Sequence, residues 1–201
     1  DGQEFAAQVL TVSKREVSVD IGAAATPQTE SLVHTALGLC LSKGDRFDWA
    51  IQKATELGVG AVTPLYSERV DFSIPPDRIE KRVAHWRQIV ISACEQCGRV
   101  SIPAVSSPQP LEQWVQSVAA EQKWVLHCDD HGATRSGASK EAPVDAALLI
   151  GPEGGLTDQE VARACENSFE VLQLGPRVLR TETAPVVALS ALSVMWGEMP
   201  G

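Results

Sequence analysis

Residues 148–161 have the sequence LLIGPEGGLTDQEV, and this stretch decides the fold class. It begins as an apolar strand that ends at Ile150 and passes directly into a glycine-rich turn. Thr157 and Glu160 then have the spacing of a capping box, in which two side chains accept hydrogen bonds from backbone amides at the start of a helix. The stretch therefore predicts a buried strand, a turn and a helix, which together form the repeating unit of an α/β protein.

The same alternation of strand and helix extends outward over most of the chain. Short apolar stretches between turn residues predict buried strands at residues 31–41, 61–66, 123–128, 146–150 and 169–174. Apolar residues at helical spacing predict helices at residues 45–57, 77–97, 111–119, 157–166 and 183–198. In the helix at 77–97, one apolar stripe indicates packing against a core; it consists of Ile79, Val83, Trp86 and Val90. Strands separated by helices of this length are typical of a parallel sheet.

The N-terminal residues have a different pattern. Residues 4–21 alternate between apolar and polar side chains and predict two antiparallel strands with a turn near residues 13–15. Two strands are too few to bury an apolar face on their own. We therefore expect residues 1–30 to be part of a small β-domain that ends in a linker at 22–31, and residues 31–201 to form a separate α/β domain.

The composition limits the classes of function. The chain has 201 residues, of which 44% are hydrophobic and 21% are charged, so it can bury a substantial core. Its net charge of -9 argues against binding of nucleic acid through bulk charge, because phosphate contacts need clustered lysine and arginine. No apolar run approaches the ~20 residues that span a bilayer, so no membrane partner is expected.

The chain has 5 cysteines, and their odd number and scattered positions favour a reducing compartment such as the cytoplasm. Cys94 and Cys97 have the C-x-x-C spacing, but no second pair completes a zinc site. The two residues also fall at the end of an expected helix, whereas redox-active pairs lie at a helix start. We therefore predict no metal site and no redox function.

A second stretch, LGPRVLRTETAP at residues 174–185, repeats the arrangement of strand, glycine-proline turn and helix. Ligands of α/β sheets bind at the carboxyl ends of the strands, so the two loops would converge if their strands were neighbours. Neither loop has a phosphate-binding glycine motif or a lysine, and Glu153 would repel a phosphate. The two loops predict a planar ligand that is uncharged or cationic, such as an adenosyl group. The alternative is that the glycines only serve tight turns.

Five segments resemble one family. They are IQKATELGV (51–59), PLYSER (64–69), ACEQCGR (93–99), IGPEGGLTDQE (150–160) and LGPRVLRTETA (174–184). In this order they are similar to the RsmE family of the SPOUT superfamily, bacterial enzymes that transfer a methyl group from S-adenosylmethionine to N3 of a uridine in 16S ribosomal RNA. The resemblance implies an α/β fold with a SPOUT-type parallel sheet and a C-terminal deep trefoil knot. It also implies that residues 1–30 belong to a PUA-like β-barrel, and that the protein is a homodimer acting on the small ribosomal subunit.

The same resemblance assigns site residues. Three loops would hold S-adenosylmethionine, largely through their main chain, with the residues Leu126, His127, Gly151, Glu153, Gly154, Gly155, Leu174, Gly175, Val178, Leu179 and Thr181. Contacts with RNA are expected from Arg69, Glu95, Gln96, Arg99 and Arg177.

Catalysis is expected at Arg180 and Glu182. N3 of uracil carries a proton, which must leave before a methyl group can be accepted, so the site needs a base or a cation that stabilises the deprotonated ring. We assign the cationic role to Arg180 and the role of base or orienting residue to Glu182. The alternative is that the two side chains pair with each other and hold the loop, and such pairing would make Glu182 a poor base.

Two other functions remain open. One is methylation of a ribose 2′-hydroxyl by a different knotted RNA methyltransferase. The other is a non-catalytic module for ribosome assembly or RNA binding that retains the pocket without the chemistry.

Overall fold

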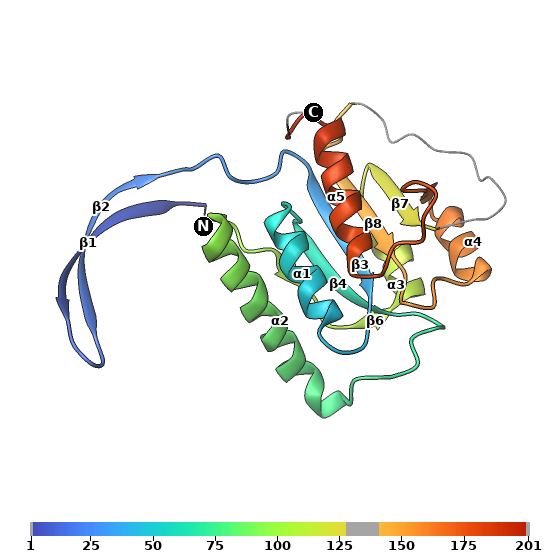
Figure 1. The fold of residues 1–201 in the computed structure, drawn as a ribbon, viewed down its shortest axis with the longest axis horizontal. Coiled ribbons are helices and arrows are strands. Elements are labelled where there is room, and N and C mark those ends of the chain that lie inside the picture. Colours follow the sequence, from blue (N-terminus) through green and yellow to red (C-terminus); the bar gives the residue numbers. More distant parts are fainter. Residues whose placement is uncertain (1, 128–140, 200–201) are drawn as a thin grey trace.

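The computed structural model describes residues 2–127 and 141–199. Over these residues a parallel sheet lies between two layers of helices, and a separate β-hairpin projects from this body (Figure 1). The α/β class with a parallel sheet is thereby confirmed. Within the described part of the chain, no helix is long and apolar enough to cross a membrane.

The sheet has seven strands: β3 (His34–Cys40), β4 (Ala61–Tyr66), β5 (Ala104–Val105), β6 (Gln109–Pro110), β7 (Gln122–Leu126), β8 (Asp145–Ile150) and β9 (Glu170–Leu172). Their order is β5-β4-β3-β8-β7-β9, with β6 beside β4, and each strand is parallel to its neighbours. The five expected strands are present, although Cys128, placed at the end of one of them, lies outside the described residues. The strands β5 and β6 were not predicted, because two residues are too short to establish a period.

Helices cover both faces of the sheet. On one face lie α1 (Arg46–Glu56), α2 (Pro76–Cys97) and α5 (Thr183–Met195), and on the other lie α3 (Leu111–Ser117) and α4 (Asp158–Glu166). Each face of the sheet therefore has its own hydrophobic core. Because side chains alternate along a strand, Leu148 and Ile150 of β8 pack in the core beneath α1, α2 and α5, while Ala147 and Leu149 pack in the core beneath α3 and α4.

The apolar stripe predicted on α2 faces the core that α2 shares with α1 and α5. Val83, Trp86 and Val90 are buried, and Ile79 packs against them with partial exposure. Trp86 also packs against Phe47 of α1, with tilted rings whose centroids are 4.7 Å apart, so the stripe holds α2 against α1.

The capping box is confirmed and determines where α4 begins. The Glu160 amide donates to the Thr157 hydroxyl at 3.3 Å, and the Thr157 amide donates to the Glu160 carboxylate at 2.8 Å. These bonds satisfy amides that have no partner inside the helix. The turn before α4 is therefore held at its C-terminal end.

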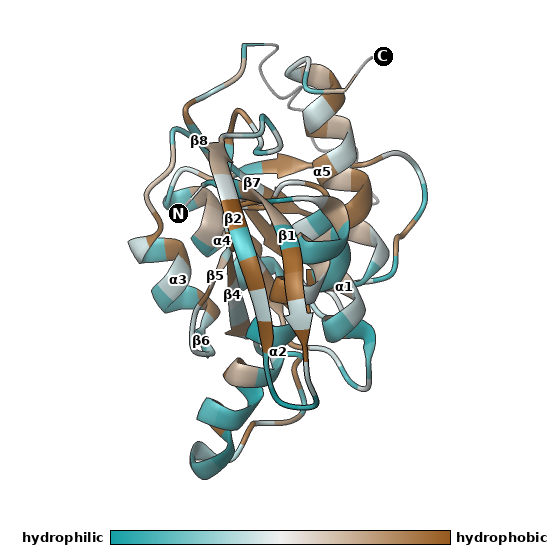
Figure 2. Ribbon diagram, turned by 90° about the vertical axis from the view of Figure 1, so that its left-hand side faces the viewer, coloured by the Kyte–Doolittle hydropathy of each residue, from teal (hydrophilic) through white to brown (hydrophobic). Residues whose placement is uncertain are grey.

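The hairpin consists of β1 (Glu4–Val12) and β2 (Val17–Ala25), which pair antiparallel as expected. Strand β2 extends to Ala25, so the first part of the expected linker at 22–31 is strand instead; its backbone pairs with Glu4 and Phe5. Every residue of both strands is exposed, including the apolar residues Phe5 and Ile21. Figure 2 shows hydrophobic segments, in brown, along β1 and β2.

Two carboxylates attach the segment before β3 to the body. Glu30 accepts hydrogen bonds from Arg99 at 2.7 Å and from the amides of Val100 and Ser101. Glu198, which follows α5, accepts from the Leu32 amide at 2.7 Å and from the Val33 amide at 3.2 Å. Burial raises the pKa of Glu30, but Arg99 and the two amides outweigh burial and hold that pKa below its ordinary value.

Candidate functional site

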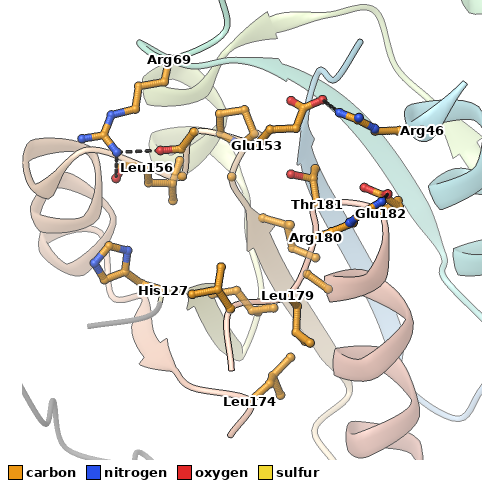
Figure 3. Close-up of a pocket in the computed structure, with 18 of the residues that line it drawn as sticks. Arg46, Arg69, His127, Glu153, Leu156, Leu174, Leu179, Arg180, Thr181 and Glu182 are labelled. Carbon is orange, nitrogen blue, oxygen red and sulfur yellow. Dashed lines mark hydrogen bonds and ion pairs between the residues drawn. The ribbon is translucent and has the colours of Figure 1, made fainter. Parts of the chain in front are cut away.

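A cavity of about 610 Å³ lies at the carboxyl ends of β7, β8 and β9 (Figure 3). Its walls are the loop that follows β8, the segment between β9 and α5, and the end of β7. The two glycine-proline loops therefore converge, but the reason differs from the expected one. Their strands are not neighbours, because β7 lies between β8 and β9, and so Leu126 and His127 enter the wall between the two loops.

The cavity brings together most of the residues predicted from the sequence. Lining residues from the predicted cofactor set are Leu126, His127, Gly151, Glu153, Gly154, Gly155, Leu174, Val178, Leu179 and Thr181. Gly175 is exposed and is not among the lining residues. Arg180 and Glu182 line the cavity, and so do Arg69 and Arg177. Lining residues that were not predicted are Arg46, Ile150, Pro152, Leu156, Leu172 and Ala184.

Two glycines of the loop that follows β8 are also required by the protein's own packing and backbone conformation. A Cβ on Gly151 would lie 2.9 Å from Cγ of Leu156, a side chain that is buried beneath the loop. Gly155 has a φ of 72°, a conformation that other residues rarely adopt. The positive φ that a tight turn requires is therefore present at Gly155, whereas Gly151 is required by packing against Leu156.

Arg46 is the main residue that the sequence did not reveal. It is the first residue of α1, and its guanidinium lies 2.8 Å from the Glu153 carboxylate. The backbone amide of Lys43 donates to the same carboxylate oxygen at 3.3 Å. An arginine at the start of a helix is usually a solvated surface residue, so no sequence pattern placed Arg46 at the site. The one feature that could have indicated a nearby cation was the acidic Glu153 inside the loop.

Arg69 holds the other side of the same loop. Its Nη1 atom donates to the carbonyl oxygen of Gly154 at 2.7 Å and to that of Leu156 at 3.4 Å. We predicted Arg69 to bind RNA, and it does lie at the rim of the cavity (Figure 3). Its guanidinium nevertheless faces protein carbonyls.

Arg180 and Glu182 are close but weakly paired. The Nη1 atom of Arg180 lies 4.0 Å from Oε1 of Glu182, with side-chain exposures of 81% and 17%. At this distance and exposure an ion pair contributes little. The Oε2 atom of Glu182 is buried and has no hydrogen-bond partner among the described residues. Glu182 thus lines the cavity with a side chain that is mostly buried, and its Oε2 atom is closed to solvent.

The residues of the ACEQCGR segment lie elsewhere. Arg99 donates to Glu30, which precedes β3, and to the carbonyl oxygens of Thr55, near the end of α1, and Val59, just before β4. Because the strands are parallel, this position is the edge of the sheet opposite the cavity. The Arg99 side chain is only 6% exposed, so contact with RNA would require these bonds to break. Glu95 and Gln96 are exposed on the last turn of α2, at the same edge.

No cysteine is among the described residues that line the cavity. Burial raises the pKa of Cys40, at the end of β3, to about 12. Burial also raises the pKa of Cys94, in the last turn of α2 rather than at a helix start. The four described cysteines, Cys40, Cys94, Cys97 and Cys165, are all free.

Comparison with known proteins now identifies the family. Residues 29–193 match the model of the RNA methyltransferase domain family. Ribosomal RNA small subunit methyltransferase E of Buchnera aphidicola is 32% identical over 195 residues, which are 97% of this chain and 79% of that protein. The chain belongs to the ribosomal RNA small subunit methyltransferase E family. The resemblance to the RsmE family is therefore confirmed, and with it the assignment of the chain as an RNA methyltransferase.

Two solved structures are similar over the same length. A methyltransferase of Legionella pneumophila, solved with bound S-adenosylmethionine, is 40% identical with a TM-score of 0.89; the match covers 96% of this chain and 79% of that chain. A ribosomal RNA small subunit methyltransferase E of Neisseria gonorrhoeae, bound to S-adenosylmethionine, is 36% identical with a TM-score of 0.88, over 97% and 80% of the two chains. The Legionella pneumophila and Neisseria gonorrhoeae proteins thus have the same fold as this chain over the matched residues.

Proposed function

We propose that this member of the RsmE family uses S-adenosylmethionine to methylate N3 of a uridine in the 16S ribosomal RNA of the small subunit. The observation that carries the proposal is the cavity at the carboxyl ends of β7, β8 and β9, built from the two loops that identify the family. The similar proteins of Legionella pneumophila and Neisseria gonorrhoeae bind S-adenosylmethionine, which supports the choice of cofactor.

The residues present fit an adenosyl group that carries a cationic sulfonium. Partly buried apolar side chains supply surfaces for a planar ring; they are Leu126, Leu172, Leu174 and Leu179. The exposed backbone of the glycine loop supplies hydrogen-bonding groups, and Glu153 and Glu182 supply negative charge. No lysine is found among the described residues that line the cavity. When bound, the cofactor would supply the electrophilic methyl group.

The side chains that act on uracil are Arg180 and Glu182. Arg180 is exposed at the mouth, where its guanidinium can stabilise negative charge on the uracil oxygens as the N3 proton leaves. Glu182 lines the same wall with a side chain that is 17% exposed, and its carboxylate either accepts that proton or orients the ring.

The RNA approaches the mouth of the cavity in this proposal. Arg177 and Arg180 are exposed there, and they give local positive charge to a chain whose net charge is -9. Glu95 and Gln96 lie at the opposite edge, so they would contact RNA or a second subunit only within an assembly. We propose a homodimer acting on the assembled small subunit.

The finer features of the fold belong to the same proposal. After β9, at one edge of the sheet, the chain passes the carboxyl ends of the strands and continues into α5 on the face covered by α1. This course supports a trefoil knot in the C-terminal segment.

The exposed apolar residues of β1 and β2 support a PUA-like domain at residues 1–30, separate from residues 31–201. Free cysteines and a ribosomal substrate support a cytoplasmic location.

A methylation assay on small ribosomal subunits tests the function. The wild-type protein should transfer the methyl group of S-adenosylmethionine to N3 of one uridine, located by mass spectrometry of digested RNA. A methyl group on ribose would instead support the 2′-hydroxyl methyltransferase. Calorimetry that detects no binding of S-adenosylmethionine to the folded protein would support the non-catalytic module.

A further inference from the structure

The loop at residues 151–156 is held from outside by two arginines that come from separate elements. Arg46 belongs to α1 and pairs with the Glu153 carboxylate at 2.8 Å. Arg69 follows β4 and donates to the carbonyl oxygens of Gly154 and Leu156. Figure 3 shows the two guanidinium groups on either side of the loop, above the cavity. Between them they contact three of its residues.

Other contacts act near the ends of the loop or on one side chain: the Lys43 amide donates to Glu153, Leu156 is buried, and the capping box of α4 follows the loop. Within it, the Gly155 amide donates to the Pro152 carbonyl at 2.9 Å and closes a single turn. Glycine loses more conformational freedom on ordering than any other residue, so a loop with three glycines needs external contacts to stay in one conformation. Hydrogen bonds from a guanidinium are charge-assisted and stronger than those between neutral groups.

The packing of Arg69 on the loop is close as well as polar. A Cβ on Gly154 would lie 3.4 Å from both Cβ and Cδ of Arg69, so the aliphatic part of the arginine covers this glycine. The side chain therefore lies along the loop, and its Nη1 atom faces carbonyl oxygens of the protein.

We infer that Arg46 and Arg69 are positioning residues that hold the glycine loop in the conformation that receives the cofactor. The inference rests on the proposed function, since it takes S-adenosylmethionine as the ligand. It replaces the RNA contact predicted for Arg69 with a role in cofactor affinity, and it adds Arg46 to the site.

Titration of S-adenosylmethionine into the RNA-free protein separates the two roles of Arg69. Arg69→Ala should raise the dissociation constant about tenfold, as expected for the loss of hydrogen bonds to a charged group. Arg46→Ala should raise it about threefold, because its partner Glu153 is partly exposed and the ion pair is screened. Arg78→Ala, an exposed arginine on α2 away from the cavity, is the matched control and should change nothing.

Kinetics on small ribosomal subunits give the second readout. The Arg69→Ala variant should raise KM for S-adenosylmethionine and leave KM for the subunit unchanged. Arg69→Lys separates the roles further: a lysine keeps a point charge for phosphate, but its shorter side chain lacks the guanidinium whose Nη1 atom donates to both carbonyls. It should therefore leave cofactor affinity weakened.

Hydrogen exchange without ligand gives a readout that is independent of activity. The Gly155 amide should exchange faster in Arg69→Ala than in the control, while core amides of β8 keep their protection. Unchanged exchange and cofactor affinity, with a raised KM for the subunit, would overturn the inference and restore the RNA-binding role. A wild-type protein that fails to bind S-adenosylmethionine would remove the proposed function itself, and this inference with it.

Discussion

Arg180 and Glu182 lie 4.0 Å apart across one turn of chain, yet Arg180 is 81% exposed and Glu182 only 17%. An ion pair at this distance, with one member in solvent, contributes less than about 1 kcal/mol to stability. Mutual pairing is therefore a weak explanation for two charged residues at a cavity wall. Each side chain can be tested separately for a role in methyl transfer.

Arg180→Ala should lower kcat on small ribosomal subunits by about 100-fold or more, the effect of removing one preorganised group that stabilises charge in the transition state. The dissociation constant for S-adenosylmethionine should stay within about twofold, because the exposed guanidinium faces the mouth of the cavity. Single-turnover kinetics and calorimetry measure the two quantities. Full activity in this variant would exclude the catalytic assignment of Arg180.

Glu182→Gln should lower kcat while leaving the protein as stable as the wild type, or more stable. The Oε2 atom is buried without a partner among the described residues, and an unpaired charge in such a place disfavours folding. Gain of stability with loss of activity is typical of a functional residue. Thermal unfolding and kcat should therefore change in opposite directions. A fall in both would instead indicate that Glu182 holds the loop.

The contact between Glu30 and Arg99 should be visible in the pH dependence of stability. Since the folded-state pKa of Glu30 lies below its ordinary value of 4.5, the carboxylate stabilises the folded protein above that value, and this contribution is lost as the pH falls through the lowered pKa. The difference in unfolding free energy between wild type and Glu30→Gln should be constant above pH ~6 and shrink below pH ~4.5. Urea denaturation at a series of pH values measures it, with Glu16→Gln on the hairpin turn as the control. A difference that does not depend on pH would contradict the assigned pKa direction.

Local sequence patterns predicted the elements of this fold and the place of its cavity. The capping box at Thr157 and Glu160 and the apolar stripe on α2 were visible because their partners are three or four residues away. The convergence of the two loops was predicted on the condition that their strands are neighbours. The loops do converge at the shared carboxyl edge, although β7 separates the two strands.

The remaining features depend on pairings between distant residues. The insertion of β7 between β8 and β9 is a property of strand order, which no local period encodes. Arg46 meets Glu153 from a different helix, and Arg99 is buried by Glu30 from the segment before β3. An arginine in a sequence has the same appearance whether its partner is RNA, solvent or a carboxylate far along the chain. For this reason the sequence did not reveal Arg46 as a lining residue or Glu30 as the partner of Arg99.

Gly151 and Gly154 provide a final test of why the loop contains glycine. A Cβ on Gly151 would lie 2.9 Å from the Leu156 side chain and 3.1 Å from its backbone nitrogen, so Gly151→Ala should destabilise the protein by about 1–3 kcal/mol. A Cβ on Gly154 would meet Arg69 at 3.4 Å, and no positive φ restricts this position, so Gly154→Ala should fold with little change in Tm. If the cofactor lies against the Gly154 backbone, the same variant should weaken binding of S-adenosylmethionine severalfold. Thermal unfolding and calorimetry of the two variants therefore distinguish a glycine required by packing from a glycine required by the ligand, and unchanged affinity in Gly154→Ala would leave the covering arginine as the sole reason for that residue.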